Sequence, residues 1–114
     1  MPHGIMFHHF SDDKHRAGQG AISGDQLARL IEFIGRDRIL SAEEWFTLAC
    51  RDELKDDDLC LTFDDALLCQ FEVAEPVLRS YSISALWFIY SSVVSGGVEM
   101  LEVYRNFRTM CFAS

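Results

Sequence analysis

The pattern of apolar and polar positions along the chain predicts short strands alternating with helices. Four apolar runs bounded by polar turn residues are typical of strands, and they span residues 4–10, 38–40, 59–63 and 85–90. The runs at 59–63 and 85–90 are almost continuously apolar. Because parallel strands with both faces covered show such runs, we expect these two strands to be buried, and 85–90 to be central in the sheet.

Between the strands, apolar residues recur at a helical period. Ser23 begins a capping-box sequence, Ser-Gly-Asp-Gln, ahead of an amphipathic helix that Gly35 ends. Ser41 begins a second capping box, and we expect Trp45 and Phe46 of the helix that follows to lie in the core. These helices are predicted to cover one face of a sheet.

Further along, a regular helix is predicted to start near Glu75, because Pro76 is tolerated only in the first turn of a helix. A closing helix is predicted from the apolar face formed by Met100, Leu101, Tyr104, Phe107 and Cys111. A closed barrel needs roughly 200 to 250 residues, and this chain has 114. We therefore expect one α/β domain, a partial (β/α) barrel of about four parallel strand–helix units.

Candidate chemistry lies where two of the strands end. Asp64 and Asp65 directly follow the strand at 59–63, and His8 and His9 close the first strand. The carboxyl ends of parallel strands meet at one edge of a sheet, where ligands gather. Consecutive strand residues point to opposite faces, so both carboxylates can face one site only if the backbone leaves strand geometry there. One carboxylate could then coordinate a divalent metal while its neighbour accepts a proton from water.

Ordinary structural roles can also explain these residues. An Asp-Asp pair after a strand is a common turn or helix-cap sequence, and a histidine pair at a strand end need have no role.

The sequence at the end of the strand at 59–63 resembles a motif of a known family. Thr62-Phe63-Asp64-Asp65 resembles the Thr-Phe-Asp-Asp signature of the polysaccharide deacetylase (NodB-like, carbohydrate esterase) family. Residues 75–78 and 83–89 are similar to the helix and next strand of that family, and residues 4–10 to its first strand, which often ends in Tyr-His or His-His. The resemblance implies that residues 1–114 form the N-terminal part of a deacetylase catalytic domain with a TIM-like barrel.

The resemblance also implies a function in carbohydrate metabolism. Family members are metal-dependent hydrolases that remove the acetyl group from an N-acetylated sugar or glycan precursor, for example in surface polysaccharide biosynthesis. By resemblance, Asp64 is the general base and Asp65 a ligand of a divalent metal, most simply zinc. His8 and His9 are then candidates for binding the sugar substrate.

Two features depart from the family pattern. Ala66 stands where the family has glycine, which alters a tight backbone approach to the site. The family takes two further metal ligands from a His-x-x-x-His motif, but all four histidines of this chain precede Asp64. We therefore expect either the front half of a longer enzyme or an incomplete homologue without activity.

Composition and charge argue against several other classes of function. A formal net charge of −8 and no basic stripe argue against nucleic-acid binding, and no Gly-rich loop precedes a lysine as in phosphate-handling enzymes. Four cysteines without a C-x-x-C pair suggest reduced thiols. No apolar run of membrane-spanning length and no secretory signal are visible, so we expect a cytoplasmic protein without membrane contact.

Two alternatives to the enzyme stay open. One is a non-catalytic interaction module, a half-barrel whose open sheet edge is covered by a second copy in a homo-oligomer, or by another partner. The other is a simple metal-binding protein that uses His8, His9, Asp64 and Asp65 as ligands.

Overall fold

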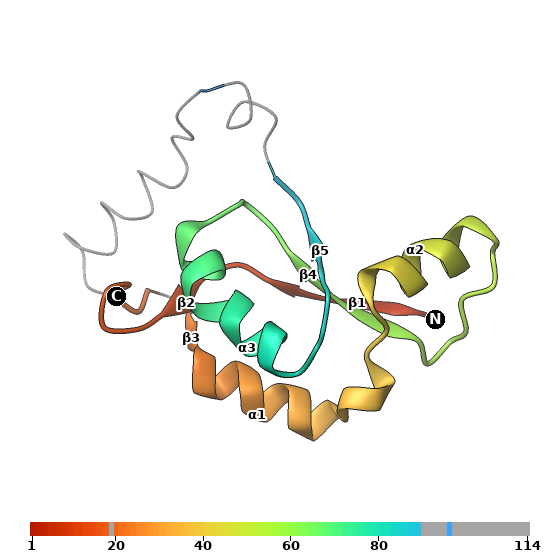
Figure 1. The fold of residues 1–114 in the computed structure, drawn as a ribbon, viewed down its shortest axis with the longest axis horizontal. Helices are drawn as coiled ribbons and strands as arrows, with labels where there is room; N and C mark the ends of the chain where they lie inside the picture. The colour runs from red at the N-terminus through yellow and green to blue at the C-terminus, as the bar shows by residue number, and fades with distance from the viewer. Residues whose placement is uncertain (19, 90–95, 97–114) are drawn as a thin grey trace.

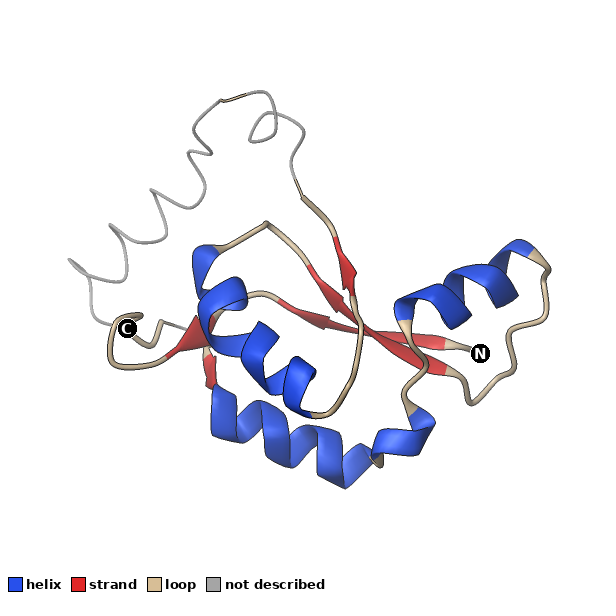
Figure 2. Ribbon diagram, in the orientation of Figure 1, coloured by secondary structure: helices blue, strands red, loops and turns tan. Residues whose placement is uncertain are grey.

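The structure is a computed structural model that describes residues 1–18, 20–89 and 96, and it shows a mixed α/β fold (Figures 1 and 2). In chain order its elements are β1 (His3–Phe7), β2 (Phe10–Ser11), β3 (Ile22–Ser23), α1 (Gly24–Ile34), the 3-10 helix η1 (Arg36–Arg38), α2 (Ala42–Cys50), β4 (Leu59–Phe63), the π-helix η2 (Gln70–Ala74), α3 (Glu75–Ser80) and β5 (Leu86–Trp87).

The sheet consists of parallel strands in the order β1-β4-β5, with β4 in the middle. In its register, Phe7 lies opposite Phe63. β2 and β3 form a second, two-stranded parallel pair, with Phe10 opposite Ile22. The predicted parallel strand–helix arrangement is confirmed, although in the described part of the chain the strands form open sheets and do not close into a barrel.

β4 is buried along its whole length, as its apolar sequence predicts. Because side chains alternate between faces, Leu61 and Phe63 lie on one face and Cys60 and Thr62 on the other. We call the first the helix face, because its side chains join the core formed with the helices. The opposite face, which also carries Met6 of β1, we call the second face. Burial raises the pKa of the Cys60 thiol on the second face.

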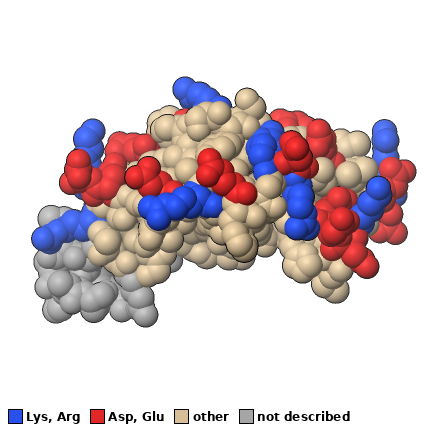
Figure 3. All heavy atoms as spheres, turned by 90° about the horizontal axis from the view of Figure 1, so that it is seen from below, with Lys and Arg blue, Asp and Glu red and all other residues tan. Residues whose placement is uncertain are grey.

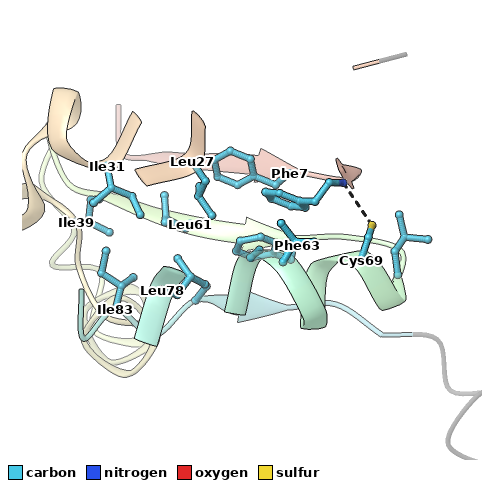
Figure 4. Close-up of a cluster of buried hydrophobic side chains, with 14 of the residues drawn as sticks. Phe7, Leu27, Ile31, Ile39, Leu61, Phe63, Cys69, Leu78 and Ile83 are labelled. Carbon is cyan, nitrogen blue, oxygen red and sulfur yellow. Dashed lines mark hydrogen bonds between the residues drawn. The ribbon is translucent and has the colours of Figure 1, made fainter. Parts of the chain in front are cut away.

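The core on the helix face is built around aromatic rings. Phe7 and Phe63 stack with their ring centroids 5.3 Å apart, and the Phe10 ring lies 5.8 Å from that of Phe63. Leu27 and Ile31 of α1 reach this cluster, together with residues of η2 and α3 (Figure 4). α1 and α3 also pack against each other. Burial of these apolar side chains fixes both helices against the sheet.

The first helix begins and ends where the sequence predicts. The Ser23 side chain accepts a hydrogen bond from the Gln26 backbone N–H (3.1 Å), and the Gln26 side chain accepts one from the Ser23 N–H (2.8 Å). This is a complete capping box. Gly35 follows the helix at a φ of 98°, a conformation that glycine adopts without a Cβ clash.

The start of α3 at Glu75, with Pro76 in the first turn, is also confirmed, but a π-helical turn precedes it. Proline has no N–H to donate to the carbonyl of residue 72, and its ring crowds that carbonyl. A wider turn before the proline is a way to accommodate both effects.

The predicted strand at 38–40 is wrong. Its place is taken by η1 and by a single parallel bridge between Ile39 and Leu59, where the Leu40 N–H donates to the Leu59 carbonyl (2.8 Å). The Arg36 guanidinium donates to the carbonyls of Tyr81 (2.6 Å) and Ser82 (2.7 Å). These bonds tie the 3-10 turn to the segment at 81–82, so tertiary anchoring decides the conformation of this run.

Two expectations about burial are also wrong. β5 lies at an edge of the described sheet, not at its centre, and Phe88 and Ile89 beyond it are 57% and 61% exposed. In α2, Phe46 is 65% exposed and no residue is fully buried. Figure 1 shows α2 beside the N-terminal end of β1 and away from α1 and α3, and none of its residues belongs to the main core. Tyr90 and the expected closing helix lie outside the described residues.

Acidic and basic side chains are interspersed on the face of the molecule that Figure 3 shows. None of the helices within residues 1–18 and 20–89 has the length and apolar character needed to cross a membrane.

The contrast between β4 and α2 gives a stability prediction. Leu61→Ala removes a fully buried side chain and should lower the free energy of unfolding by about 2–5 kcal/mol. Phe46→Ala, at a largely exposed position, should change it by less than about 1 kcal/mol. Urea unfolding of both variants measures the difference; similar losses would mean that α2 is packed as tightly as β4.

Candidate active site

The register of the sheet places His8 beside Asp64. Phe7 lies opposite Phe63, and Asp64 continues the ladder because its N–H donates to the Phe7 carbonyl (3.1 Å). His8 and Asp64 are therefore the next facing pair. By alternation both extend the second face, on which Met6 is paired with Thr62.

Asp65 reaches the same place because the backbone leaves strand geometry. Its φ is 75°, in the left-handed region, and Ala66 follows at 48°. His8 Nε2 lies 3.9 Å from Oδ2 of Asp64 and 3.9 Å from Oδ2 of Asp65, so the imidazole is close to both carboxylates. The exposed fractions of these side chains are 42% for His8, 29% for Asp64 and 16% for Asp65. The backbone turn expected from the sequence is present.

His9 is not brought to this cluster. By alternation it belongs to the opposite face from His8, and its carbonyl accepts a hydrogen bond from the Ile22 N–H (3.2 Å) in the small sheet. Within the described residues, no ion pair or hydrogen bond joins the His9 ring to Asp64 or Asp65. Its role as a substrate contact stays a prediction.

Gln70 is a member of the site that sequence reasoning missed. Its side chain is 1% exposed, and its amide Nε2 donates to the carbonyls of His8 (2.7 Å) and Asp64 (2.5 Å). The signal in the sequence was a polar residue within the apolar stretch Leu-Leu-Cys-Gln-Phe. A buried amide needs partners, and here they are main-chain groups of the two facing residues.

A loop after β2 is tied to the helix that carries Gln70. The His15 ring Nε2 lies 2.8 Å from Oε2 of Glu72 in η2. The Asp12 carboxylate accepts hydrogen bonds from the backbone N–H groups of His15 and Lys14, and these bonds hold the pKa of Asp12 below its usual value. The exposed loop predicted after the first strand therefore has an ordered first turn.

We call the strand ends that carry His8, Asp64 and Asp65 the rim of the sheet. The side chains of the rim supply only part of the ligand set that a metal needs. Asp64 and Asp65 offer carboxylate oxygens and His8 an imidazole nitrogen, all suitable for zinc. However, residues 1–18 and 20–89 contain no group of three or more His, Cys, Asp or Glu side chains placed to hold a metal ion. A site at this rim would need at least one ligand that the described residues do not supply.

Fold and rim together define an α/β protein with two carboxylates and an imidazole at the carboxyl end of a parallel sheet. Its fold is similar to that of the Streptococcus pyogenes deacetylase PplD, in a structure in complex with acetate, with a TM-score of 0.59 and 21% identity. The match covers 92% of this chain and 51% of the deacetylase, so the chain spans about half the length of that protein. No family profile and no curated protein matches the chain. The likeness shows a deacetylase-like fold.

The backbone turn at the rim gives a second stability prediction. Ala66 has a positive φ, which costs an L-residue with a Cβ roughly 1 kcal/mol. Ala66→Gly should therefore leave stability unchanged or raise it by up to about 1 kcal/mol. The matched control is Ala49→Gly in α2, which should cost about 0.5–1 kcal/mol because the alanine there is helical. Thermal unfolding of both variants reports the sign, and equal losses would contradict the turn.

Proposed function

We propose that this chain carries the catalytic carboxylates of a hydrolase that removes the acetyl group from an N-acetylated sugar or glycan precursor. The observation that carries the proposal is the convergence of His8, Asp64 and Asp65 at one rim, with both carboxylates 3.9 Å from the imidazole. The deacetylase-like fold supports the reaction class, and the resemblance of residues 62–65 to the polysaccharide deacetylase signature supports the sugar substrate.

In this proposal the two carboxylates have different roles. Asp64 is the more exposed of the two, so it can face the attacking water and act as the general base. Asp65 is 16% exposed and is held by a left-handed turn, which suits a fixed ligand of a divalent metal such as zinc. When bound, such a metal polarises an amide carbonyl and lowers the pKa of a bound water.

The reaction is the hydrolysis of an amide bond. Water oxygen attacks the acetyl carbon while Asp64 takes a proton from that water. Asp64 then returns this proton to the nitrogen as the C–N bond breaks, which releases a free sugar amine and acetic acid that ionises to acetate. His8, whose ring is partly exposed beside the acid pair, is placed to contact the sugar. The proposed metal site needs a further ligand, and no histidine follows His15 in the sequence.

Substitution of each aspartate separates the two roles. Asp65→Asn should weaken zinc binding by at least about tenfold, because it removes a charged ligand. Asp64→Asn should retain the metal affinity but lower turnover by about 10²–10⁴-fold, since it removes the base. Isothermal titration with zinc and release of acetate from an N-acetylated sugar, with zinc or cobalt added, measure the two quantities.

Three outcomes would count against the proposal. If the folded chain releases no acetate with either metal, the hydrolase is excluded for this chain. If Asp64→Asn releases acetate at the original rate, Asp64 is not the base. If Asp65→Asn binds zinc as tightly as the original chain, Asp65 is not a ligand.

A second candidate function is an interaction module that pairs with another copy of itself through the β5 edge. In its favour, Trp87, Phe88 and Ile89 are 38%, 57% and 61% exposed along one short segment. Exposed neighbouring apolar side chains on an edge strand are typical of a surface that another chain covers.

Sedimentation velocity tests this candidate. The chain should sediment as a dimer, and Phe88→Asp should convert it to a monomer because burial of a charge at the interface is unfavourable. The control is Phe33→Asp, because Phe33 is 89% exposed and lies on α1 rather than on the β5 edge. A monomer before substitution, or equal effects of both variants, would exclude pairing through this edge.

A further inference from the structure

Gln70 joins the two strand ends that carry the candidate site. The last backbone bond between β1 and β4 runs from the Asp64 N–H to the Phe7 carbonyl. Beyond it, the Gln70 amide donates to the carbonyls of His8 (2.7 Å) and Asp64 (2.5 Å), so one side chain binds the main chain of both facing residues. Beyond the last backbone hydrogen bond of the ladder, the Gln70 amide holds the two strand ends together.

The helix that carries Gln70 is anchored a second time next to the rim. The adjacent residue, Cys69, is buried, and its Sγ accepts a hydrogen bond from the Phe10 N–H (3.3 Å; dashed line in Figure 4). Residues 69 and 70 therefore hold the main chain of residues 8 and 10. The start of η2 and the segment that leaves β1 form one connected unit.

One polar atom of the Gln70 side chain, Oε1, is buried without a hydrogen-bond partner in the described part of the chain. Burial of an unpaired acceptor is unfavourable, and an apolar side chain of similar length would avoid it. The same replacement would, however, leave the carbonyls of His8 and Asp64 without the amide donor. Glutamine at this position therefore suits the hydrogen bonds at the rim better than it suits an apolar core.

We propose that Gln70 is a positioning residue that keeps the His8 imidazole close to the carboxylates of both Asp64 and Asp65. Its amide fixes the separation of the two main-chain segments, and the side chains follow. The effect on turnover rests on the proposed deacetylase function, whereas the effect on the rim itself does not.

The test is Gln70→Met, which keeps the length of the side chain and removes both donors. Turnover of an N-acetylated sugar should fall about 10–100-fold with KM little changed, as is usual when a group that orients a reacting residue is lost. Amide hydrogen exchange at Asp64 should become at least about tenfold faster, because the rim opens locally. Exchange at Phe88, whose N–H donates to the Phe63 carbonyl on the other side of β4, should not change.

Leu78→Ala is the matched control. Leu78 is 2% exposed and lies in α3, which continues directly from η2, and its side chain belongs to the apolar core. This variant should lose stability but keep the turnover of the folded molecules and the exchange rate of Asp64 relative to Phe88. Gln70→Asn is a second variant; its amide is one methylene shorter and can reach one carbonyl only, so its effects should lie between those of the original chain and Gln70→Met.

The two proposals fail in different ways. If Gln70→Met behaves like Leu78→Ala in both turnover and exchange, the positioning role is overturned. If the original chain releases no acetate, the deacetylase function fails, and the exchange of Asp64 alone decides the role of Gln70. If Gln70→Met does not fold, Gln70→Asn decides it by the same comparison: unchanged exchange at Asp64 overturns the role.

Discussion

The register of β1 against β4 is the constraint on which the candidate site depends. Phe7 and Phe63 face each other and stack on the helix face of the sheet, with Phe10 completing the aromatic cluster. Because side chains alternate, the next residues of the two strands, His8 and Asp64, must emerge together on the opposite face. A slip of one residue would send the two to different faces and separate them. The packing of aromatic rings on the helix face therefore determines that His8 and Asp64 lie side by side at the edge of the sheet.

The rim itself is built from features that depart from regular structure. Two successive residues with positive φ, Asp65 and Ala66, form the turn where the Asp65 carboxylate approaches the same imidazole as Asp64. A π-helical turn places Gln70 against the main chain of both strand ends, with one acceptor unpaired. Each feature costs free energy and persists only because the packed core around it holds the chain. Such departures often gather at functional sites in proteins, and here they lie at the edge proposed as the site.

Local signals were reliable at several places where a few neighbouring residues decide the structure, although at Ser41 only the N-cap bond of the predicted capping box is present. The capping box at Ser23, the glycine after α1 and the proline at the start of α3 act within one turn, so their sequence patterns predicted them correctly. The strand at 59–63 was also predicted correctly, because its apolar run needs cover on both sides. Expectations failed at 38–40 and for Phe46, since hydrophobicity alone does not say which neighbour is available to cover a residue.

The sequence by itself determined that β4 is buried and parallel, and that two carboxylates follow it where ligands gather. It could not choose between His8 and His9, because that choice depends on the register with a strand more than fifty residues away. Nor could it show Gln70 as part of the rim, since its partners are backbone carbonyls that carry no sequence signal. The sequence shows directly which side chains the protein has. Which residues face each other across a sheet, and which main-chain groups a side chain reaches, is decided only when the strands pair.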